Sequence, residues 1–244
     1  MIDEKKVIFI IPAYNEELNI ARVINEIKNE FKSSKILVIN DCSKDKTKDI
    51  VKKEGITCIT QTFNMGYAMA IQTGIKYAKD HDYQYVIQFD ADGQHIASEA
   101  KKLLEKIEET KCDIVIGSRF LEKGSYNQTF FRKLGTNIFS FLIKVFCKKK
   151  ITDPTSGFQC LGRKAIERFS SFGMYPEFPD ANLIIELLYN GFIIEEIPVK
   201  MRLREFGESM HGGILKPIKY MISILYTICI IILRNVFRRK RGAK

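Results

Sequence analysis

The stretch Tyr85-Val-Ile-Gln-Phe-Asp-Ala-Asp-Gly-Gln94 passes from an apolar run into a short acidic loop. Its first five residues have the composition of a buried strand, and Asp90 and Asp92 follow where that strand would end. Carboxylate oxygens suit Mg²⁺ and Mn²⁺, and Mg²⁺ commonly bridges a protein carboxylate to substrate phosphates. An Asp-x-Asp pair is also common in ordinary solvated turns. The neighbouring strands therefore decide whether this loop is a metal site or a turn.

Strand-like runs alternate with helical periodicities through the first half of the chain. Val7-Ile-Phe-Ile-Ile11 is a short apolar run that Pro12 ends, and apolar residues recur at helical spacing from Glu16 onward. We expect further strands at residues 35–39, 57–60, 85–89 and 113–117, and helices at residues 45–53, 68–79 and 98–109, the last beginning at a Ser98 cap. The alternation predicts an α/β fold with a mostly parallel, Rossmann-like central sheet and helices on both faces.

The second half of the chain is less regular. Helices are expected at about residues 130–144 and at residues 181–189, with Asp180 as the N-cap of the second. The turn-rich segment Asp153-Pro-Thr-Ser-Gly157 lies between them, and residues 192–199 return as a strand broken by Pro198. We expect one catalytic domain over residues 1–213 and a C-terminal apolar helix with a basic tail over residues 214–244.

Polar segments follow four of the expected strands. They are Pro12-Ala-Tyr-Asn-Glu-Glu17, Asn40-Asp-Cys-Ser-Lys-Asp45, Asp90-Ala-Asp-Gly-Gln94 and Ser118-Arg119. In a parallel sheet the carboxyl ends of the strands meet at one edge, which is where ligands bind. Helix capping could account for Asp41 or Ser43 individually, but it explains poorly why several such segments share one edge. The sequence therefore favours a site there for a nucleotide-like ligand.

The charge of the chain favours phosphate-rich partners. Its 244 residues carry a formal net charge of +10. The clusters Lys148-Lys-Lys150 and Arg238-Arg-Lys-Arg241, the second after an apolar run, indicate an anionic membrane surface, and we expect no nucleic-acid partner. The six cysteines are scattered without a CxxC pair, which predicts reduced thiols. The N-terminus has no signal-peptide pattern, so export is not expected.

An apolar run near the C-terminus, residues 220–233, is too short for a simple membrane span. As a helix it would reach about 21 Å, whereas the hydrocarbon core is about 30 Å thick. We expect a peripheral or monotopic helix at the cytoplasmic side of the cell membrane, with its basic residues on anionic headgroups. A helix that packs on the catalytic domain, on a membrane-protein partner or on a second copy is the alternative.

Taken in order, the motifs resemble family 2 glycosyltransferases of the GT-A fold, and in particular the polyprenyl-phosphate and dolichyl-phosphate sugar synthases. The resemblance covers roughly residues 7–210. It rests on Ile11-Pro-Ala-Tyr-Asn-Glu16, Val38-Ile-Asn-Asp-Cys-Ser43, Asn64-Met-Gly66, Asp90-Ala-Asp-Gly-Gln94, Gly117-Ser-Arg119, Asp153-Pro-Thr-Ser-Gly-Phe158 and Arg204-Glu-Phe-Gly-Glu-Ser209. It implies an enzyme that transfers a sugar from a nucleoside-diphosphate sugar, with Mg²⁺ or Mn²⁺ as cofactor.

On the donor side, the resemblance implies a nucleotide pocket and a metal site. The nucleotide would contact Pro12, Ala13, Tyr14, Glu16, Asp41, Asn64, Gly66, Asp90 and Ala91. Within this set Asp41 would accept a hydrogen bond from the base, and Asp90 would lie close to the sugar or ribose. Asp92 and Gln94 would coordinate the metal that bridges the two phosphates. A UDP-sugar is favoured over a GDP-sugar as the donor.

On the acceptor side, the resemblance implies basic contacts and inversion at the anomeric carbon. Arg204 would contact phosphate from a loop, and Arg119 and Arg132 would contact the acceptor phosphate. The synthases often have lysine after the Gly-x-Ser of that loop, whereas this chain has Met210, which leaves that contact in doubt.

Two acceptor classes remain open. A polyprenyl phosphate is already mostly ionised at neutral pH, because its second pKa is about 6, and it needs no base. A hydroxyl of a cell-surface polysaccharide or glycan would need one, and by the resemblance Asp180 lies near the position where inverting members place their base. The catalytic candidates are therefore Asp90, Asp92, Asp180 and Arg204.

Other functional classes fit the sequence less well. Processive synthases of this family contain a Gln-x-x-Arg-Trp motif, and this chain has no Trp. A nucleotidyltransferase would show a glycine-rich, basic phosphate loop in place of Pro12-Ala-Tyr-Asn-Glu16. A binding subunit with a degenerate site is disfavoured, because Asp41, Asp90, Asp92 and Arg204 are all present.

Overall fold

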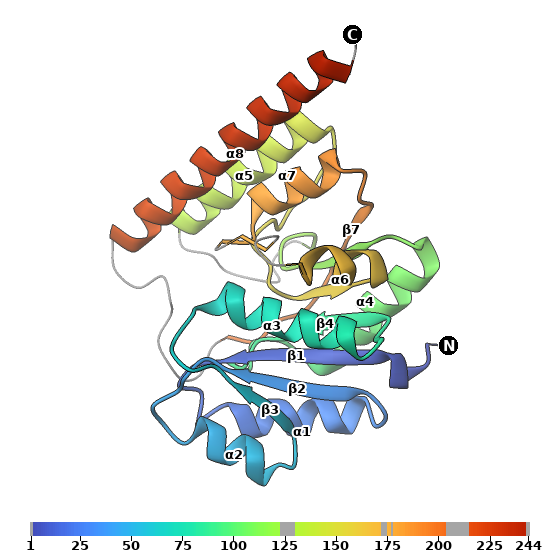
Figure 1. Cartoon of the computed structure of the whole chain (residues 1–244), viewed down its shortest axis with the longest axis vertical. Coiled ribbons are helices and arrows are strands. Elements are labelled where there is room, and N and C mark those ends of the chain that lie inside the picture. Colours follow the sequence, from blue (N-terminus) through green and yellow to red (C-terminus); the bar gives the residue numbers. More distant parts are fainter. Residues whose placement is uncertain (1, 123–129, 172–174, 177, 204–214, 243–244) are drawn as a thin grey trace.

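A seven-stranded sheet forms the centre of the described chain. The computed structural model describes residues 2–122, 130–171, 175–176, 178–203 and 215–242. The strands are β1 (Val7–Ala13), β2 (Lys35–Asn40), β3 (Thr57–Thr60), β4 (Tyr85–Gln88), β5 (Ile114–Ser118), β6 (Gln159–Leu161) and β7 (Ile194–Pro198), and their order is β3-β2-β1-β4-β6-β5-β7 (Figure 1). The pairs β1–β2, β1–β4, β2–β3 and β5–β7 are parallel, whereas β6 is antiparallel to both of its neighbours. This confirms the expected α/β fold with a mostly parallel sheet.

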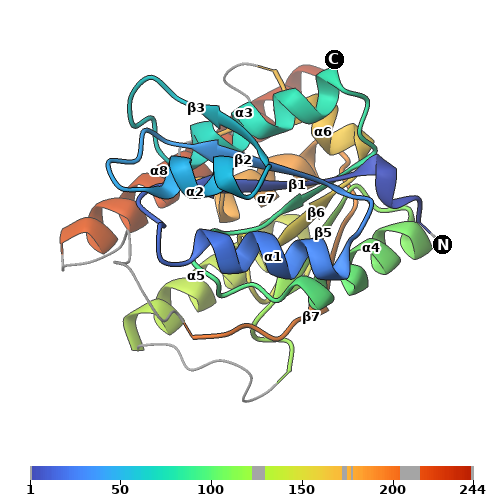
Figure 2. The ribbon, with the colours of Figure 1, turned by 90° about the horizontal axis from the view of Figure 1, so that it is seen from below.

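Helices cover both faces of the sheet because its strands alternate apolar side chains between the two sides. On β1, Ile8 and Ile10 face one core, while Phe9 and Ile11 face the other. The second core is closed by α1 (Ile20–Glu30), α2 (Thr47–Lys53) and α4 (Ala97–Thr110), as Figure 2 shows from below. The first core is closed by α3 (Tyr67–Asp80), α5 (Phe130–Cys147), α6 (Arg163–Phe169), α7 (Ala181–Tyr189) and α8 (Leu215–Gly242). A short 3₁₀ helix, Glu4–Lys6, precedes β1.

Two helix starts differ from the sequence expectation. Helix α1 begins at Ile20 and not near Glu16, because the backbone N–H of Glu16 donates to Thr47 Oγ1 at 2.8 Å and holds this segment as a loop. Helix α4 begins at Ala97, so the predicted Ser98 cap is wrong. The Ala97 N–H instead donates to Glu26 Oε1 on α1, at 2.9 Å.

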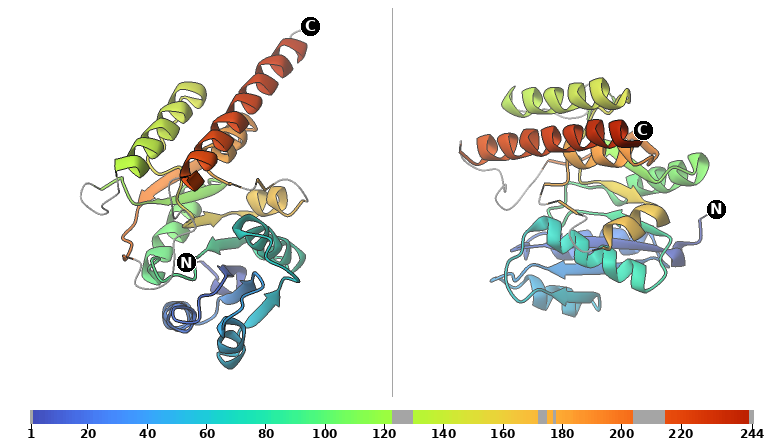
Figure 3. Two further views of the ribbon diagram at one scale, coloured as in Figure 1. Left: turned by 90° about the vertical axis from the view of Figure 1, so that its left-hand side faces the viewer. Right: turned by 45° about the horizontal axis from the view of Figure 1, so that its top comes forward.

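Helices α5 and α8 lie on the side of the molecule opposite α1 and α2 (Figures 1 and 3). They meet where a Cβ placed on Gly135 would come within 2.8 Å of the Met221 methyl group. One side of α8 is part of the core, with Ile224, Ile228 and Ile231 buried. Its other side exposes large apolar residues, and so does part of α5; they are Ile222, Tyr226, Ile230 and Leu233 on α8, and Leu134, Phe141, Val145 and Phe146 on α5.

Within the described part of the chain, no helix combines the length and the apolarity that crossing a membrane requires.

Candidate functional site

The loops after β1 and β2 are joined by backbone and side-chain hydrogen bonds. The Asp41 N–H donates to the Ala13 carbonyl at 2.9 Å, which continues the β1–β2 pairing to the edge of the sheet. Beyond it, the Asn15 N–H donates to Ser43 Oγ at 3.0 Å, and the Lys44 N–H donates to Asn15 Oδ1 at 2.9 Å. Asn15 adopts a left-handed conformation, with φ 55°. The two predicted polar segments after β1 and β2 are therefore bonded together at the carboxyl ends of these strands. Pro12 and Ala13 belong to β1, and Tyr14 is exposed.

Asp41 holds the loop that precedes α3. Its two carboxylate oxygens accept hydrogen bonds from the backbone N–H groups of Met65, at 2.7 Å, and Gly66, at 2.8 Å. The Asn64 side chain donates to the Asp41 carbonyl at 3.4 Å. Gly66 has a φ of 87°, a conformation that glycine adopts without strain. The structure thus brings Asp41, Asn64 and Gly66 together and gives Asp41 a scaffolding role, while its contact with a base stays a prediction.

Asp90 lies against the start of α3. The Tyr67 hydroxyl donates to Asp90 Oδ1 at 3.2 Å. A Cβ on Gly157 would lie 2.9 Å from the Tyr67 oxygen and 3.5 Å from Asp90 Oδ2, so the Asp153–Gly157 loop closes over this pair where only glycine fits. Burial, followed by the Asp90 charge, raises the pKa of Tyr67 well above its usual value, so the phenol stays protonated and donates.

His95 supports Asp90 from the other side. The Asp90 N–H donates to His95 Nδ1 at 3.0 Å, and the ring lies between Phe158, stacked at 4.5 Å between ring centroids, and Phe89, edge-on at 5.2 Å. Burial lowers the pKa of His95 to about 4, so the imidazole is neutral near pH 7. Because Nδ1 accepts, the ring proton is on Nε2, which lies 3.5 Å from Asp90 Oδ2.

The loop from Asp92 to Gln94 is braced by a segment that follows β7. The Gln94 N–H donates to Asp92 Oδ1 at 3.0 Å. The Arg202 N–H donates to the Gln94 carbonyl at 2.8 Å, and Gln94 Nε2 donates to the Arg202 carbonyl at 3.3 Å. Because the amide nitrogen is used in this way, Oε1 is the atom with which Gln94 could bind a metal ion. Two carboxylates and an amide oxygen on one short loop fit the oxygen-ligand preference of Mg²⁺ or Mn²⁺.

Backbone space and an ion pair fix the position of this loop. Gly93 has a φ of 76°, and a Cβ there would come within 2.2 Å of an Arg22 guanidinium nitrogen. Arg202 binds Glu26 in a bidentate manner, at 2.6 and 3.1 Å, and Glu26 is the same side chain that accepts from Ala97 at the start of α4. The predicted phosphate contact Arg204 and its neighbour Met210 lie outside the described residues.

Arg119 is engaged with Asp153. The Arg119 Nε and Nη2 atoms donate to the two Asp153 carboxylate oxygens at 2.7 and 2.8 Å, and Nη2 also donates to Thr155 Oγ1 at 3.1 Å. Asp153 is fully buried, and its own N–H donates to Glu196 Oε1 at 2.7 Å. Contact between Arg119 and an acceptor phosphate stays a prediction. The side chain of Arg132, on α5, is outside the description.

The side chain of Asp180 does not cap α7, in contrast to what the sequence suggests. It occupies the N-cap position of α7, but its side chain makes no capping hydrogen bond. Oδ2 instead accepts from the Tyr220 hydroxyl of α8 at 2.5 Å. Burial raises the pKa of Asp180 to about 6, and the hydrogen bond from Tyr220 opposes that rise. Asp153 raises this pKa further and Arg119 lowers it, so all three charges share one region of the site.

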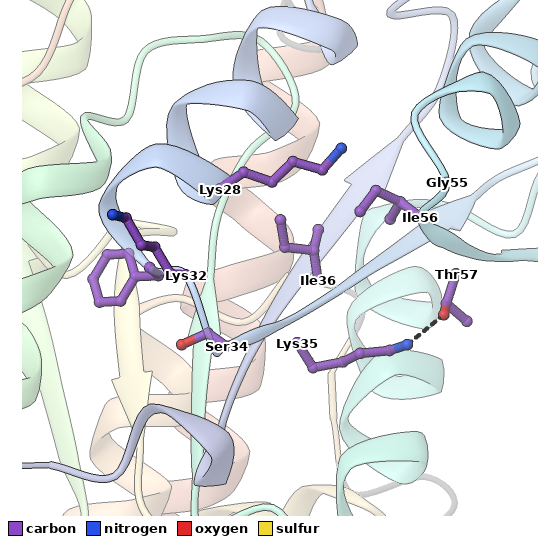
Figure 4. A pocket seen from close by; sticks show the side chains of 9 residues that line it. Lys28, Lys32, Ser34, Lys35, Ile36, Gly55, Ile56 and Thr57 are labelled. Atoms are coloured by element: carbon purple, nitrogen blue, oxygen red, sulfur yellow. Dashed lines mark hydrogen bonds between the residues drawn. The ribbon is translucent and has the colours of Figure 1, made fainter.

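A hollow of about 240 Å³ lies far from these groups, at the opposite end of β2 and β3 (Figure 4). Lys28 and Lys35 line it together with Lys32, and the three side chains extend in different directions in Figure 4. Lys28 Nζ donates to the Glu54 carbonyl at 2.8 Å, and Lys35 Nζ donates to Thr57 Oγ1 at 2.6 Å. The hollow therefore does not belong to the site at the carboxyl ends of the strands.

The sequence analysis missed several supporting side chains, namely Tyr67, His95, Glu26, Arg202 and Tyr220. Two of them have a local signal, because Tyr67 directly follows Asn64-Met-Gly66 and His95 directly follows Gln94. Tyr220 is the first residue of an apolar run, where a tyrosine reads as one more apolar side chain. Nothing in its neighbourhood along the chain indicates Asp180 as its partner.

Comparison with known proteins relates this geometry to a family. The sequence model described as Glycosyl transferase family 2 matches residues 8–169. The chain is 26% identical over 243 residues to the UDP-N-acetylglucosamine--dolichyl-phosphate N-acetylglucosaminyltransferase of Methanococcus voltae, covering 91% of this chain and 96% of that protein. It is 28% identical over 226 residues to the undecaprenyl-phosphate mannosyltransferase of Micrococcus luteus, covering 86% of this chain and 89% of that protein.

A solved structure shares the fold. Glucosyl-3-phosphoglycerate synthase from Mycobacterium tuberculosis, in complex with Mn²⁺ and UDP-glucose, matches with a TM-score of 0.66. The identity is 18%, and the match covers 91% of this chain and 78% of that one. At this identity the likeness shows the fold alone.

Proposed function

The chain belongs to the family 2 glycosyltransferases, and on that premise we propose that it moves a sugar from a nucleoside-diphosphate sugar to a polyprenyl phosphate, with inversion at the anomeric carbon. The observation that carries the proposal is the set of four polar strand ends at one edge of the sheet, with the Asp90–Gln94 loop held by Tyr67 of α3, by His95 directly after the loop and by Arg202 after β7. Two relatives with lipid-phosphate acceptors in their names span nearly the whole chain, which supports the acceptor class.

On the donor side, the proposal assigns separate tasks to two carboxylates. Asp90, which Tyr67 and the neutral His95 hold in place, would face the sugar or ribose. Asp92 and Gln94 would hold a divalent cation, which when bound would stabilise the charge developing on the departing diphosphate. Solved structures of this fold that contain Mn²⁺ are consistent with a divalent metal, and the Methanococcus voltae relative, whose name includes UDP-N-acetylglucosamine, supports a UDP-sugar.

On the acceptor side, the proposal needs no proton acceptor if the substrate is a lipid phosphate, because that phosphate is already ionised. The basic residues Arg119, Arg132 and Arg204 would orient it for attack from the face opposite the diphosphate. Positioning by fixed charges is a large part of catalysis for such a reaction.

One observation favours a second acceptor class, a hydroxyl of a glycan. A raised pKa of about 6 suits Asp180 to act as a general base near neutral pH. Asp180→Asn separates the two classes. Loss of transfer to a hydroxyl, with transfer to polyprenyl phosphate retained, would identify a base needed only for the hydroxyl. Retained transfer to both would exclude Asp180 as an essential base.

We further propose that the protein works at the cytoplasmic membrane surface, attached through α8 and α5. The two helices lie on the same side of the molecule (Figure 3), and both carry exposed apolar side chains. The basic cluster at residues 148–150 directly follows α5, and the cluster at residues 238–241 belongs to the C-terminal end of α8; both would contact anionic headgroups. A membrane-protein partner or a second copy on the same helices is the competing outcome.

The function is tested by incubating the purified full chain with a panel of UDP- and GDP-sugars, Mg²⁺ or Mn²⁺, and polyprenyl phosphate. The expected result is a lipid-linked sugar from one donor, with the opposite anomeric configuration, and no product when EDTA is present. A product formed equally well in EDTA, or none from any donor, would contradict the proposal.

A further inference from the structure

Helix α8 contributes a side chain to the candidate site. The Tyr220 hydroxyl donates to Asp180 Oδ2 at 2.5 Å, across 40 positions of sequence. The ring is held edge-on against Phe178, with ring centroids 5.2 Å apart, and faces Phe139 of α5 at 6.4 Å. Contacts from α5 and from the segment before α7 therefore hold the phenol at the carboxylate.

Asp180 is surrounded by groups whose charges bear on it. Tyr220 faces it from α8, and the Arg119–Asp153 ion pair faces it from the ends of β5 and the loop before β6. Asp180 and Asp90 both act on the buried phenols of Tyr67 on α3 and Tyr175. Burial raises the pKa values of these two tyrosines, so both are neutral near pH 7. Tyr220 donates directly to the Asp180 carboxylate.

We propose that Tyr220 is a positioning residue of the acceptor side, whose hydroxyl holds the Asp180 carboxylate in place and in its ionised form. This rests on the proposed function, since it gives the candidate anchor helix a second task within the same site. A hydrogen bond to an ionised carboxylate stabilises the charged form. Without the hydroxyl, Asp180 would keep its desolvation but lose its donor, and it would take up a proton at higher pH.

Two matched substitutions test the proposal. Tyr220→Phe removes only the hydroxyl and keeps the ring between Phe139 and Phe178. Tyr226→Phe is the same change on the same helix, at a side chain that is 67% exposed. The Asp180 carboxyl signal is assigned by its loss in Asp180→Asn. It is then followed by ¹³C NMR against pH in the wild-type protein, in Tyr220→Phe and in Tyr226→Phe. Thermal unfolding checks that each variant is folded.

We expect the Asp180 titration to move upward by about one pH unit in Tyr220→Phe and to stay unchanged in Tyr226→Phe. With a hydroxyl acceptor, for which Asp180 would be the base, the acidic limb of transfer should move with it, which gives about a tenfold loss at pH 5 and little change at pH 8.5. An unchanged titration in Tyr220→Phe, or an equal shift in Tyr226→Phe, would overturn the proposal.

The carboxyl titration and the transfer assay separate two failures. If wild-type protein transfers no sugar, the proposed function fails, while the titration still decides whether Tyr220 controls Asp180. If transfer to a hydroxyl occurs and the titration shifts but the acidic limb of that transfer does not, the pair has no positioning role in the reaction, and this inference alone is wrong.

Discussion

The proposed donor side and the proposed acceptor side of the site are built in different ways. On the donor side, loops at the ends of neighbouring strands bind one another, as when Asp41 takes the backbone N–H groups of Met65 and Gly66. On the acceptor side, single side chains reach across the fold, as when Tyr220 of α8 meets Asp180 at the start of α7. The first arrangement depends on backbone geometry that short motifs specify. The second depends on how whole helices pack.

The largest effect is expected on the donor side, from Asp92→Asn. Replacing this carboxylate removes a charged oxygen ligand from the loop, and we expect transfer to fall about a thousandfold at fixed metal concentration. Asp49→Asn, on the exposed surface of α2, is the matched control and should leave transfer unchanged. Initial rates measured against Mn²⁺ concentration check this. Equal rates in the two variants would remove Asp92 from the metal site.

A second donor-side change, Asp41→Asn, tests the scaffold and not the chemistry. The amide can accept with one oxygen only, so one of the hydrogen bonds from Met65 and Gly66 is lost in a buried place. We expect a fall of about 1–3 kcal/mol in the free energy of unfolding, measured in urea, and weaker UDP binding by calorimetry. Unchanged stability with weaker binding would show that Asp41 serves the nucleotide alone.

The outer surface of the acceptor side is tested by Ile222→Glu combined with Tyr226→Glu. Both side chains are exposed on α8, so the fold should tolerate the change. We expect binding to vesicles containing anionic lipid to fall about 10- to 100-fold, because the apolar contact is replaced by negative charge. Ile193→Glu, at the exposed residue before β7, is the control. Truncation before α8 is less informative, since Ile224, Ile228 and Ile231 belong to the core. Equal vesicle binding by the two proteins would contradict membrane attachment through α8.

The smallest effect concerns the stability cost of Asp180. Its pKa is raised from an ordinary 3.8 to about 6 in the folded protein, so the protonated form is favoured by folding. The stabilisation is present below pH 3.8 and is lost as the pH rises through about 6. Asp180→Asn should therefore raise the free energy of unfolding by about 1–2 kcal/mol at pH 8; this figure is smaller than the full pKa shift would give, because the side chain is partly exposed. At pH 4 the substitution should not change the free energy of unfolding. A pH-independent difference would contradict the raised pKa.

The same contrast explains what the sequence could predict of the fold. The apolar runs at the start of β1, β2 and β4 located those strands, because burial on both faces leaves a continuous apolar signal. Strand β6 was missed because three residues are too few to show a period. The start of α1 was misplaced because Thr47, on another helix, holds Glu16 in a loop.

The candidate site divides along the same line. The motifs drew attention to the Asp41, Asn64–Gly66 and Asp90–Gln94 segments, which the structure places at one edge of the sheet. The burial of the His95 ring depends in part on Phe158, and the protonation state of Asp180 depends in part on Tyr220, and both contacts are made only by the folded chain. Residues that act only through tertiary contacts are not marked by a motif or a regular spacing in the sequence.

The central claim is that this enzyme joins a nucleotide-linked sugar to a lipid phosphate. It is tested most directly by offering the purified protein polyprenyl phosphate and the dephosphorylated polyprenol side by side, with one active donor and Mn²⁺, and by measuring the lipid-linked sugar that forms. The account predicts rapid product formation from the phosphate, none from the alcohol, and loss of product in Asp92→Asn. Equal transfer to the alcohol, or an undiminished rate in Asp92→Asn, would contradict it.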